Sequence, residues 1–236
     1  MSISSEPGDA TRREIQRVAT HILARARKAV DGEISLRVGL TGLATPAFGP
    51  EREVLRFAGG HLIHETRIGG ELRSRAMAIV GSTLGELAAF CDVDLDANLD
   101  FGHDAPLVGD RTRPIQFDQA AAEALLRWYQ IGAAALDQVI TVASDCSPVQ
   151  LWPEHFDVAI DLRTASGRCN LGAAPADAFS PQPYLYVGPH GADRPGEQAY
   201  WNVTFGALLG AELVLADPDP VAAAVRFFTQ GLRLLG

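Results

Sequence analysis

The chain has 236 residues and a net charge of −9, with 47% hydrophobic and 21% charged residues. This composition is typical of a folded globular protein with a sizeable core. A negative surface repels polyanions, and apart from Arg25–Lys28 no basic run interrupts it, so nucleic-acid binding is disfavoured. No stretch has the apolar length of a membrane span, and the first residues do not read as a secretory signal. We therefore expect a cytoplasmic protein with no membrane partner.

The three cysteines, Cys91, Cys146 and Cys169, are odd in number and show no Cys-x-x-Cys spacing. In a cytoplasmic protein this pattern favours buried thiols over disulfides or zinc ligands. The sequence also lacks GxSxG, HExxH and glycine-rich nucleotide motifs. We expect neither a cofactor nor a metal site.

The first half of the chain has the pattern of a helix followed by strands. We expect a loose tail over residues 1–10 and a helix opened by Thr11 and Glu14, which Gly32 ends. An alternating pattern then predicts a strand over residues 34–42.

Two pairs of glycines, at residues 59–60 and 69–70, separate alternating runs over residues 51–79 and predict a meander with tight turns. Thr83 and Glu86 cap a short helix that ends near Asp92. The residues that follow are polar and rich in Asp, and they predict an irregular connection.

The second half begins with a long helix over about residues 118–143. Four runs, PVQLW, FDVAIDL, PYLYVG and AYWNVTF, read as strands, and Asn170–Pro183 reads as a loop. Asp219 caps a final helix that has Pro220 in its first turn.

These elements predict an α+β fold with largely antiparallel sheets and long helices packed on one face. We expect two similar halves, residues 11–100 and 118–236, joined by an acidic connection over residues 101–117 within one compact unit. A pseudo-twofold relation between the halves is a hypothesis, because no residue-level repeat supports it.

The order of these elements, with the words STLGELAAF, LLRWYQIGAAALDQV and CSPVQLWPEHFDVAI, resembles the bacterial domain of unknown function 5996 family. The resemblance runs from Thr11 to the end of the chain, and CSPVQLWPEHFDVAI is its most specific part. Because the family is uncharacterised, the resemblance implies one architectural unit and no reaction.

The segment Trp152–Asp157 combines an aromatic ring, the carboxylate of Glu154, and a histidine. On an extended strand, His155, Asp157 and Asp161 share one face, which would suit a general base with an orienting carboxylate. The alternative is a solvated strand face. His155 and Asp157 are the candidate catalytic residues, and Trp152 and Glu154 are candidate ligand contacts.

Tyr184 and Tyr186 alternate along a predicted strand, so both phenols lie on one face and could contact a ligand. Trp201 and Asn202 offer a ring and a hydrogen-bonding amide, while Asn170 and Asp177 lie in the long loop. The alternative for each is a structural role.

These residues favour a small-molecule-binding protein, with enzymatic activity left open and an aromatic and histidine-lined pocket in the C-terminal half. One alternative is a non-enzymatic module that self-associates as a homo-oligomer. A second alternative is a metal-dependent hydrolase. His61 and His64 resemble a metal pair, but on a strand they face opposite ways.

Overall fold

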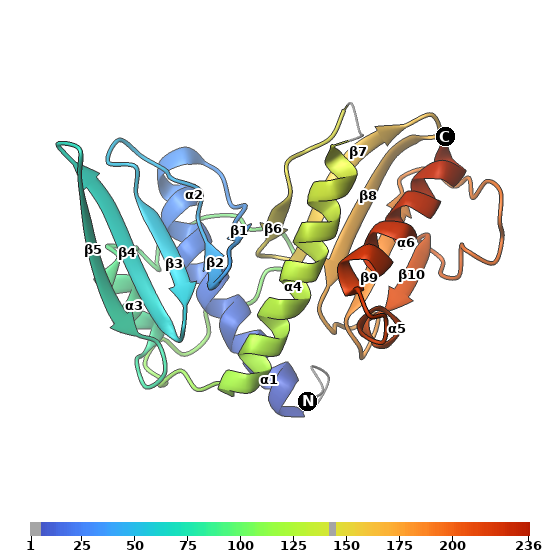
Figure 1. Ribbon diagram of the computed structural model, residues 1–236. Helices are drawn as coiled ribbons and strands as arrows, with labels where there is room; N and C mark the ends of the chain where they lie inside the picture. The colour runs from blue at the N-terminus through green and yellow to red at the C-terminus, as the bar shows by residue number, and fades with distance from the viewer. Residues whose placement is uncertain (1–5, 142–144) are drawn as a thin grey trace. The chain divides into compact units, whose positions relative to one another are not determined.

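The computed structural model describes residues 6–141 and 145–236, which form two compact units (Figure 1). The first unit comprises Met1–Leu126 and Leu151–Phe156, and the second comprises Arg127–Gln150 and Asp157–Gly236. Two five-stranded antiparallel sheets and the helices confirm the predicted α+β class. The pseudo-twofold relation stays a prediction. None of the described helices has the length and apolar content needed to cross a membrane.

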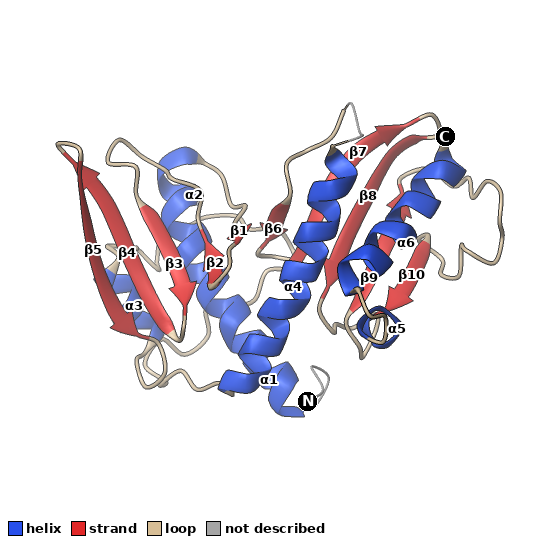
Figure 2. Cartoon of the chain, viewed as in Figure 1, coloured by secondary structure: helices blue, strands red, loops and turns tan. Residues whose placement is uncertain are grey.

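The first unit is a run of helix followed by a meander of strands. Its elements are α1 (Glu6–Val18), the π-helix η1 (Ala19–Ala24), α2 (Arg25–Asp31), β1 (Arg37–Val38), β2 (Gly42–Ala44), β3 (Val54–Ala58), β4 (His61–Ile68), β5 (Glu71–Ala78), α3 (Leu84–Phe90) and the first part of α4 (Gln119–Ile140). The strands lie in the order β1-β2-β3-β4-β5. Helices α2 and α3 lie on the same face of this sheet (Figure 2).

Alternation along the strands explains which face the helices cover. Leu55, Phe57 and Leu62 point to one face and are buried. The other face carries an ion pair between Arg56 and Glu65 of neighbouring strands, 2.9 Å apart. The glycines at 59–60 and 69–70 all have positive φ, as the predicted hairpin turns require.

Two predicted elements of this unit are wrong in extent. The first helix begins at Glu6 rather than Thr11, so only residues 1–5 of the expected tail fall outside the described residues. The strand expected over residues 34–42 is reduced to the two residues of β1 and the start of β2. Leu40, within the range of the expected strand, is 94% exposed. The capping box of Thr83 and Glu86 is confirmed.

The residues between α3 and α4 are irregular, as predicted, and lie inside the first unit. The backbone carbonyl groups of these irregular residues accept hydrogen bonds from buried side chains of the run from α1 to α2. Arg17 donates to Val108 O at 2.7 Å, and Arg25 donates to Ala97 O at 2.8 Å. His21, 3% exposed and within η1, has its Nε2 2.7 Å from Pro106 O. These contacts stabilise a segment that lacks the backbone hydrogen bonds of a helix or a strand.

The second unit is a sheet with helices on one face (Figure 1). Its elements are the rest of α4, the first residue of β6 (Gln150–Trp152), β7 (Asp157–Thr164), β8 (Gly167–Ala174), β9 (Tyr184–Pro189), β10 (Ala207–Gly210), α5 (Ala211–Leu215) and α6 (Pro220–Leu235), with sheet order β10-β9-β8-β7-β6. Trp128 of α4 donates to Ala174 O at 2.8 Å. Gly132 allows the helix to approach Ala173 of β8, because a Cβ there would lie 2.3 Å from the Ala173 Cβ.

Several predictions for this unit need correction. Strand β8 was not predicted, and it takes the first part of the expected loop Asn170–Pro183. The strand expected at AYWNVTF is wrong, since the last strand is β10 at Ala207–Gly210. The Asp219 cap with Pro220 is confirmed. The expected end of the long helix, near Ala143, lies outside the described residues.

Candidate functional site

A polar cavity of about 360 Å³ opens on the first unit. Strand register explains its position. Leu55, His64 and Arg75 are paired across β3, β4 and β5, and Thr66 is paired with Arg73. These side chains therefore continue the buried face of Leu62 toward one end of the sheet, where it becomes polar. The polar lining includes Glu51, Glu53, His64, Thr66, Arg73 and Arg75.

His64 is part of this lining and is 7% exposed. Its Nε2 is 2.9 Å from Oε2 of Glu53, and its Nδ1 is 3.0 Å from Nη2 of Arg75. Because a guanidinium group only donates hydrogen bonds, Nδ1 accepts and the ring proton is assigned to Nε2, which donates to Glu53. The contacts define one neutral tautomer.

Arg75 is held by more than this histidine. Its guanidinium carbon lies 4.7 Å from the centre of the Phe90 ring, at the end of α3. Its Nη2 is 3.7 Å from Oδ2 of Asp92. A guanidinium group held by a ring, an imidazole and a carboxylate is preoriented, so little conformational entropy is lost when it contacts a ligand.

The arrangement favours binding over proton transfer. Both ring nitrogens of His64 are engaged, so the ring cannot take a proton from a ligand without losing Arg75. Cys91 follows α3 directly, but burial raises the pKa of its thiol to about 12, which removes it as a nucleophile near neutral pH. Within the described residues, no three His, Cys, Asp or Glu side chains are grouped to hold a metal ion.

Trp152, Glu154 and His155 belong to the first unit and do not form the predicted strand face. Phe156 has φ of 58° and β7 begins only at Asp157, so the alternation that would align His155 with Asp157 is interrupted. His155 is exposed, and its Nδ1 lies 3.3 Å from Asp104 Oδ2. Trp152 and Glu154 are half-buried, and the Glu154 carbonyl accepts a hydrogen bond from Gln16 at 3.0 Å.

Asp157 and Tyr186 form a buried pair in the second unit. The Tyr186 hydroxyl donates to Oδ2 of Asp157 at 2.5 Å, and Asp157 is 7% exposed. The phenol of β9 reaches β7 by lying across Gly172 of β8, where a Cβ would come 2.5 Å from the ring. Burial, followed by the nearby Asp157 carboxylate, raises the pKa of Tyr186 well above its ordinary value. The phenol is therefore a neutral donor.

Tyr184 and Asp177 define the loop before β9. The Tyr184 hydroxyl donates to Asp177 Oδ2 at 2.8 Å, and Asp177 Oδ1 accepts from the backbone of Phe179 and Ser180. Burial, followed by this hydrogen bond, raises the pKa of Tyr184. Phe179 is 49% exposed and packs on Phe205, with ring centres 4.8 Å apart. These rings form an aromatic cluster on the second unit.

Trp201 and Asn202 are occupied by structural contacts. The Trp201 indole donates to Pro195 O at 2.8 Å, and its ring meets Tyr200 edge-on at 4.9 Å. The Asn202 amide bonds both backbone groups of Leu208, at 2.9 and 2.8 Å, and so pairs with β10 as a strand would.

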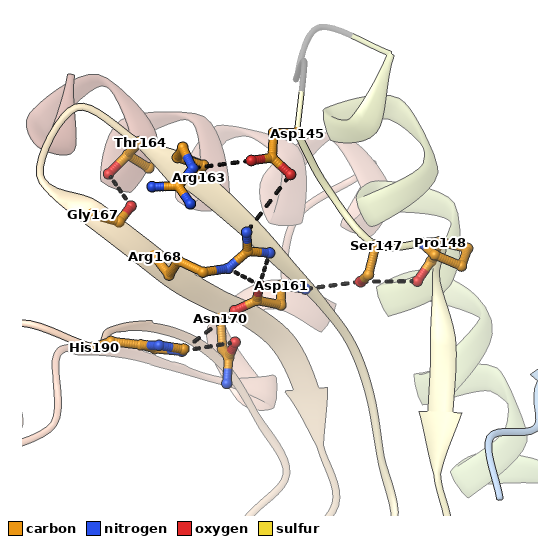
Figure 3. A network of polar contacts seen from close by, with 10 residues as sticks. All are labelled: Asp145, Ser147, Pro148, Asp161, Arg163, Thr164, Gly167, Arg168, Asn170 and His190. Atoms are coloured by element: carbon orange, nitrogen blue, oxygen red, sulfur yellow. Dashed lines mark hydrogen bonds and ion pairs between the residues drawn. The ribbon is translucent and has the colours of Figure 1, made fainter. Parts of the chain in front are cut away.

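Asn170 and Asp161 belong to a network of charged side chains on the open face of β7 and β8 (Figure 3). Asp161 bonds Arg168, and its Oδ2 is 3.3 Å from Nε2 of His190. The same Nε2 is 3.2 Å from Oδ1 of Asn170, so it carries the ring proton. The histidine that a carboxylate of β7 orients is thus His190, which is half-exposed, and not His155.

The cavity beside His64 was missed from the sequence, where His61 and His64 were considered only as a metal pair. They do face opposite ways, since His61 is exposed and bonds Gly59 O. The sequence signal for this cavity was the alternation of charged residues at the ends of β4 and β5. Without the strand register, that alternation indicates only a polar strand face.

Comparison with protein-family models, curated proteins and solved structures finds no match to the chain. The resemblance to the 5996 family therefore stays a prediction, and the functional argument depends on the geometry of the site alone.

Proposed function

We propose that this protein binds a small polar molecule in the cavity beside His64, through an anionic group of that molecule. The observation that carries the proposal is the hydrogen-bonded chain Glu53–His64–Arg75, which holds a guanidinium group at the wall of a 360 Å³ cavity. Guanidinium groups bind carboxylates and phosphates in paired hydrogen bonds. Arg73, on the same face of β5, supplies a second one.

The second candidate site is the aromatic cluster of Tyr184, Tyr186, Phe179 and Phe205. The exposed ring of Phe179 beside Phe205 favours stacking with a planar ligand there. The hydroxyls of both tyrosines are already used within the chain, so this site offers fewer polar contacts. Self-association and metal-dependent hydrolysis have no comparable support among the described contacts.

A thermal-shift panel of carboxylates, phosphates and amino acids tests the proposal. A ligand present at 100 times its dissociation constant stabilises the native state by about 2.7 kcal/mol, which is a readily measured shift. The shift should be lost in Arg75→Gln, which removes the charge and keeps an N–H donor. The matched control is Arg67→Gln, because Arg67 is exposed on β4 and does not line the cavity.

A shift that persists in Arg75→Gln would contradict this site. So would a panel in which no compound with an anionic group stabilises the chain.

A further inference from the structure

Two charged side chains in the cavity have no ion-pair partner within the described part of the chain. These are Arg73 of β5 and Glu51, which precedes β3. The other charges there are engaged: Glu53 with His64, and Arg75 with both His64 and Asp92. The cavity therefore presents one guanidinium group and one carboxylate that are both available to a ligand.

The positions of these two groups are set by strand β4. Arg73 is paired with Thr66, and the backbone carbonyl of Glu51 accepts a hydrogen bond from the backbone N–H of Arg67 at 2.8 Å. The two residues thus flank the Thr66 region of β4 from opposite sides. Neighbouring strands lie about 4.8 Å apart, so the two backbones are roughly 10 Å apart. Both side chains line the same cavity, so a ligand that contacts both lies between them.

A ligand that carries only negative charge would face the carboxylate of Glu51, together with those of Glu53 and Asp92. A ligand that carries only positive charge would face Arg73 and Arg75. Like charges brought together in this way reduce binding. A molecule with one carboxylate and one ammonium group close together matches both available side chains.

We infer that the cavity binds a zwitterion of the amino-acid class, and this inference depends on the proposed function of the site. The ligand carboxylate contacts Arg73 and Arg75, and its ammonium group contacts Glu51. Thr66, between them, supplies a hydroxyl that either donates or accepts a hydrogen bond.

Calorimetric titration of the whole chain with the common L-amino acids tests this inference. For each amino acid that binds, the N-acetyl derivative lacks the ammonium charge and the amide derivative lacks the carboxylate. We expect each derivative to bind at least about ten-fold more weakly, because each loses one charge-assisted contact.

The same titration with variants assigns the two contacts. Glu51→Gln should weaken binding of the parent amino acid but leave the affinity for the N-acetyl derivative nearly unchanged, because that derivative lacks the ammonium group that Glu51 contacts. Arg73→Gln should weaken the parent but leave the affinity for the amide derivative nearly unchanged, because that derivative lacks the carboxylate. Glu71→Gln and Arg67→Gln are the matched controls, since Glu71 of β5 and Arg67 of β4 are exposed and do not line the cavity. Neither control should change affinity.

The outcomes separate this inference from the proposed function. Simple carboxylates or N-acetyl derivatives that bind as tightly as the parent, with dependence on Arg75, would overturn the zwitterion and leave the anion site intact. Failure of every compound with an anionic group would overturn the proposed function itself.

Discussion

Nδ1 of His64 accepts hydrogen bonds from both Nε and Nη2 of Arg75, at 3.3 and 3.0 Å. With Nε2 donating to Glu53, the imidazole joins a carboxylate on one side to a guanidinium group on the other. The histidine is therefore a positioning residue, and Arg75 is the group that it presents to the cavity.

Replacing His64 should destabilise the chain through these two partners. His64→Phe keeps a ring but leaves Glu53 and Arg75 without the imidazole, and we expect a loss of about 1–3 kcal/mol in the free energy of unfolding. His61→Phe is the matched control on the opposite face of β4, and its exposed position predicts a change within about 0.5 kcal/mol. Denaturant titration measures both, and equal effects would contradict the assignment.

The buried phenol of Tyr186 predicts a similar contrast in the second unit. Tyr186→Phe removes a donor from the buried Asp157 carboxylate, so we expect a loss of about 1–3 kcal/mol. Tyr184→Phe should cost less than about 1 kcal/mol, because Asp177 is exposed and keeps two backbone donors. Urea unfolding of the two variants checks the order, and a larger effect at Tyr184 would reverse it.

Gly172 is needed beneath the Tyr186 ring. A Cβ there would lie 2.5 Å from the ring, so Gly172→Ala must displace the ring from Asp157, at a cost of about 1–3 kcal/mol. Gly188→Ala is the control, since its Cβ would meet neighbours only at ordinary contact distance. Once Tyr186 is Phe, the hydroxyl contact is already gone, so the double variant should lose less than the sum of the single losses.

Acid should weaken the first unit through His21. Burial, more than the nearby Arg25 and Arg17 charges, lowers the pKa of His21 below its ordinary 6.5. The unfolded chain then binds a proton that the folded chain does not, so stability is lost as pH falls below about 6.5 toward the folded pKa. Unfolding is measured between pH 7.5 and 5, an interval of about 2.5 units that spans this value. The free energy of unfolding should fall more steeply with pH in the wild type than in His21→Gln. Parallel profiles would contradict it.

The local signals in the sequence predicted much of the fold. Thr83 with Glu86 and Asp219 with Pro220 mark helix starts, and Gly32 marks a helix end, because capping depends on a few neighbouring residues. The extent of the first strand was wrong because Leu36 pairs with Leu151, a partner far along the chain. Local alternation cannot show such pairing.

The candidate site was less predictable, because it depends on register. His64, Arg75 and Glu53 come from three segments and meet only when the β3–β4 and β4–β5 pairing is known. At Phe156, where the chain passes from the first unit to the second, a positive φ removed His155 from the face of Asp157. A single backbone angle changed which side chains meet, and the composition of the segment carries no sign of it.

An NMR titration of the ¹⁵N-labelled chain, with the compound that gives the largest thermal shift, tests the central claim most directly. Binding beside His64 predicts amide shift changes concentrated at Thr66, Arg73 and Ser74, with changes in the His64 ring nitrogens. Shift changes concentrated at Asn170, Tyr184 and Tyr186, with those first-unit amides unchanged, would contradict the account and place the ligand on the second unit.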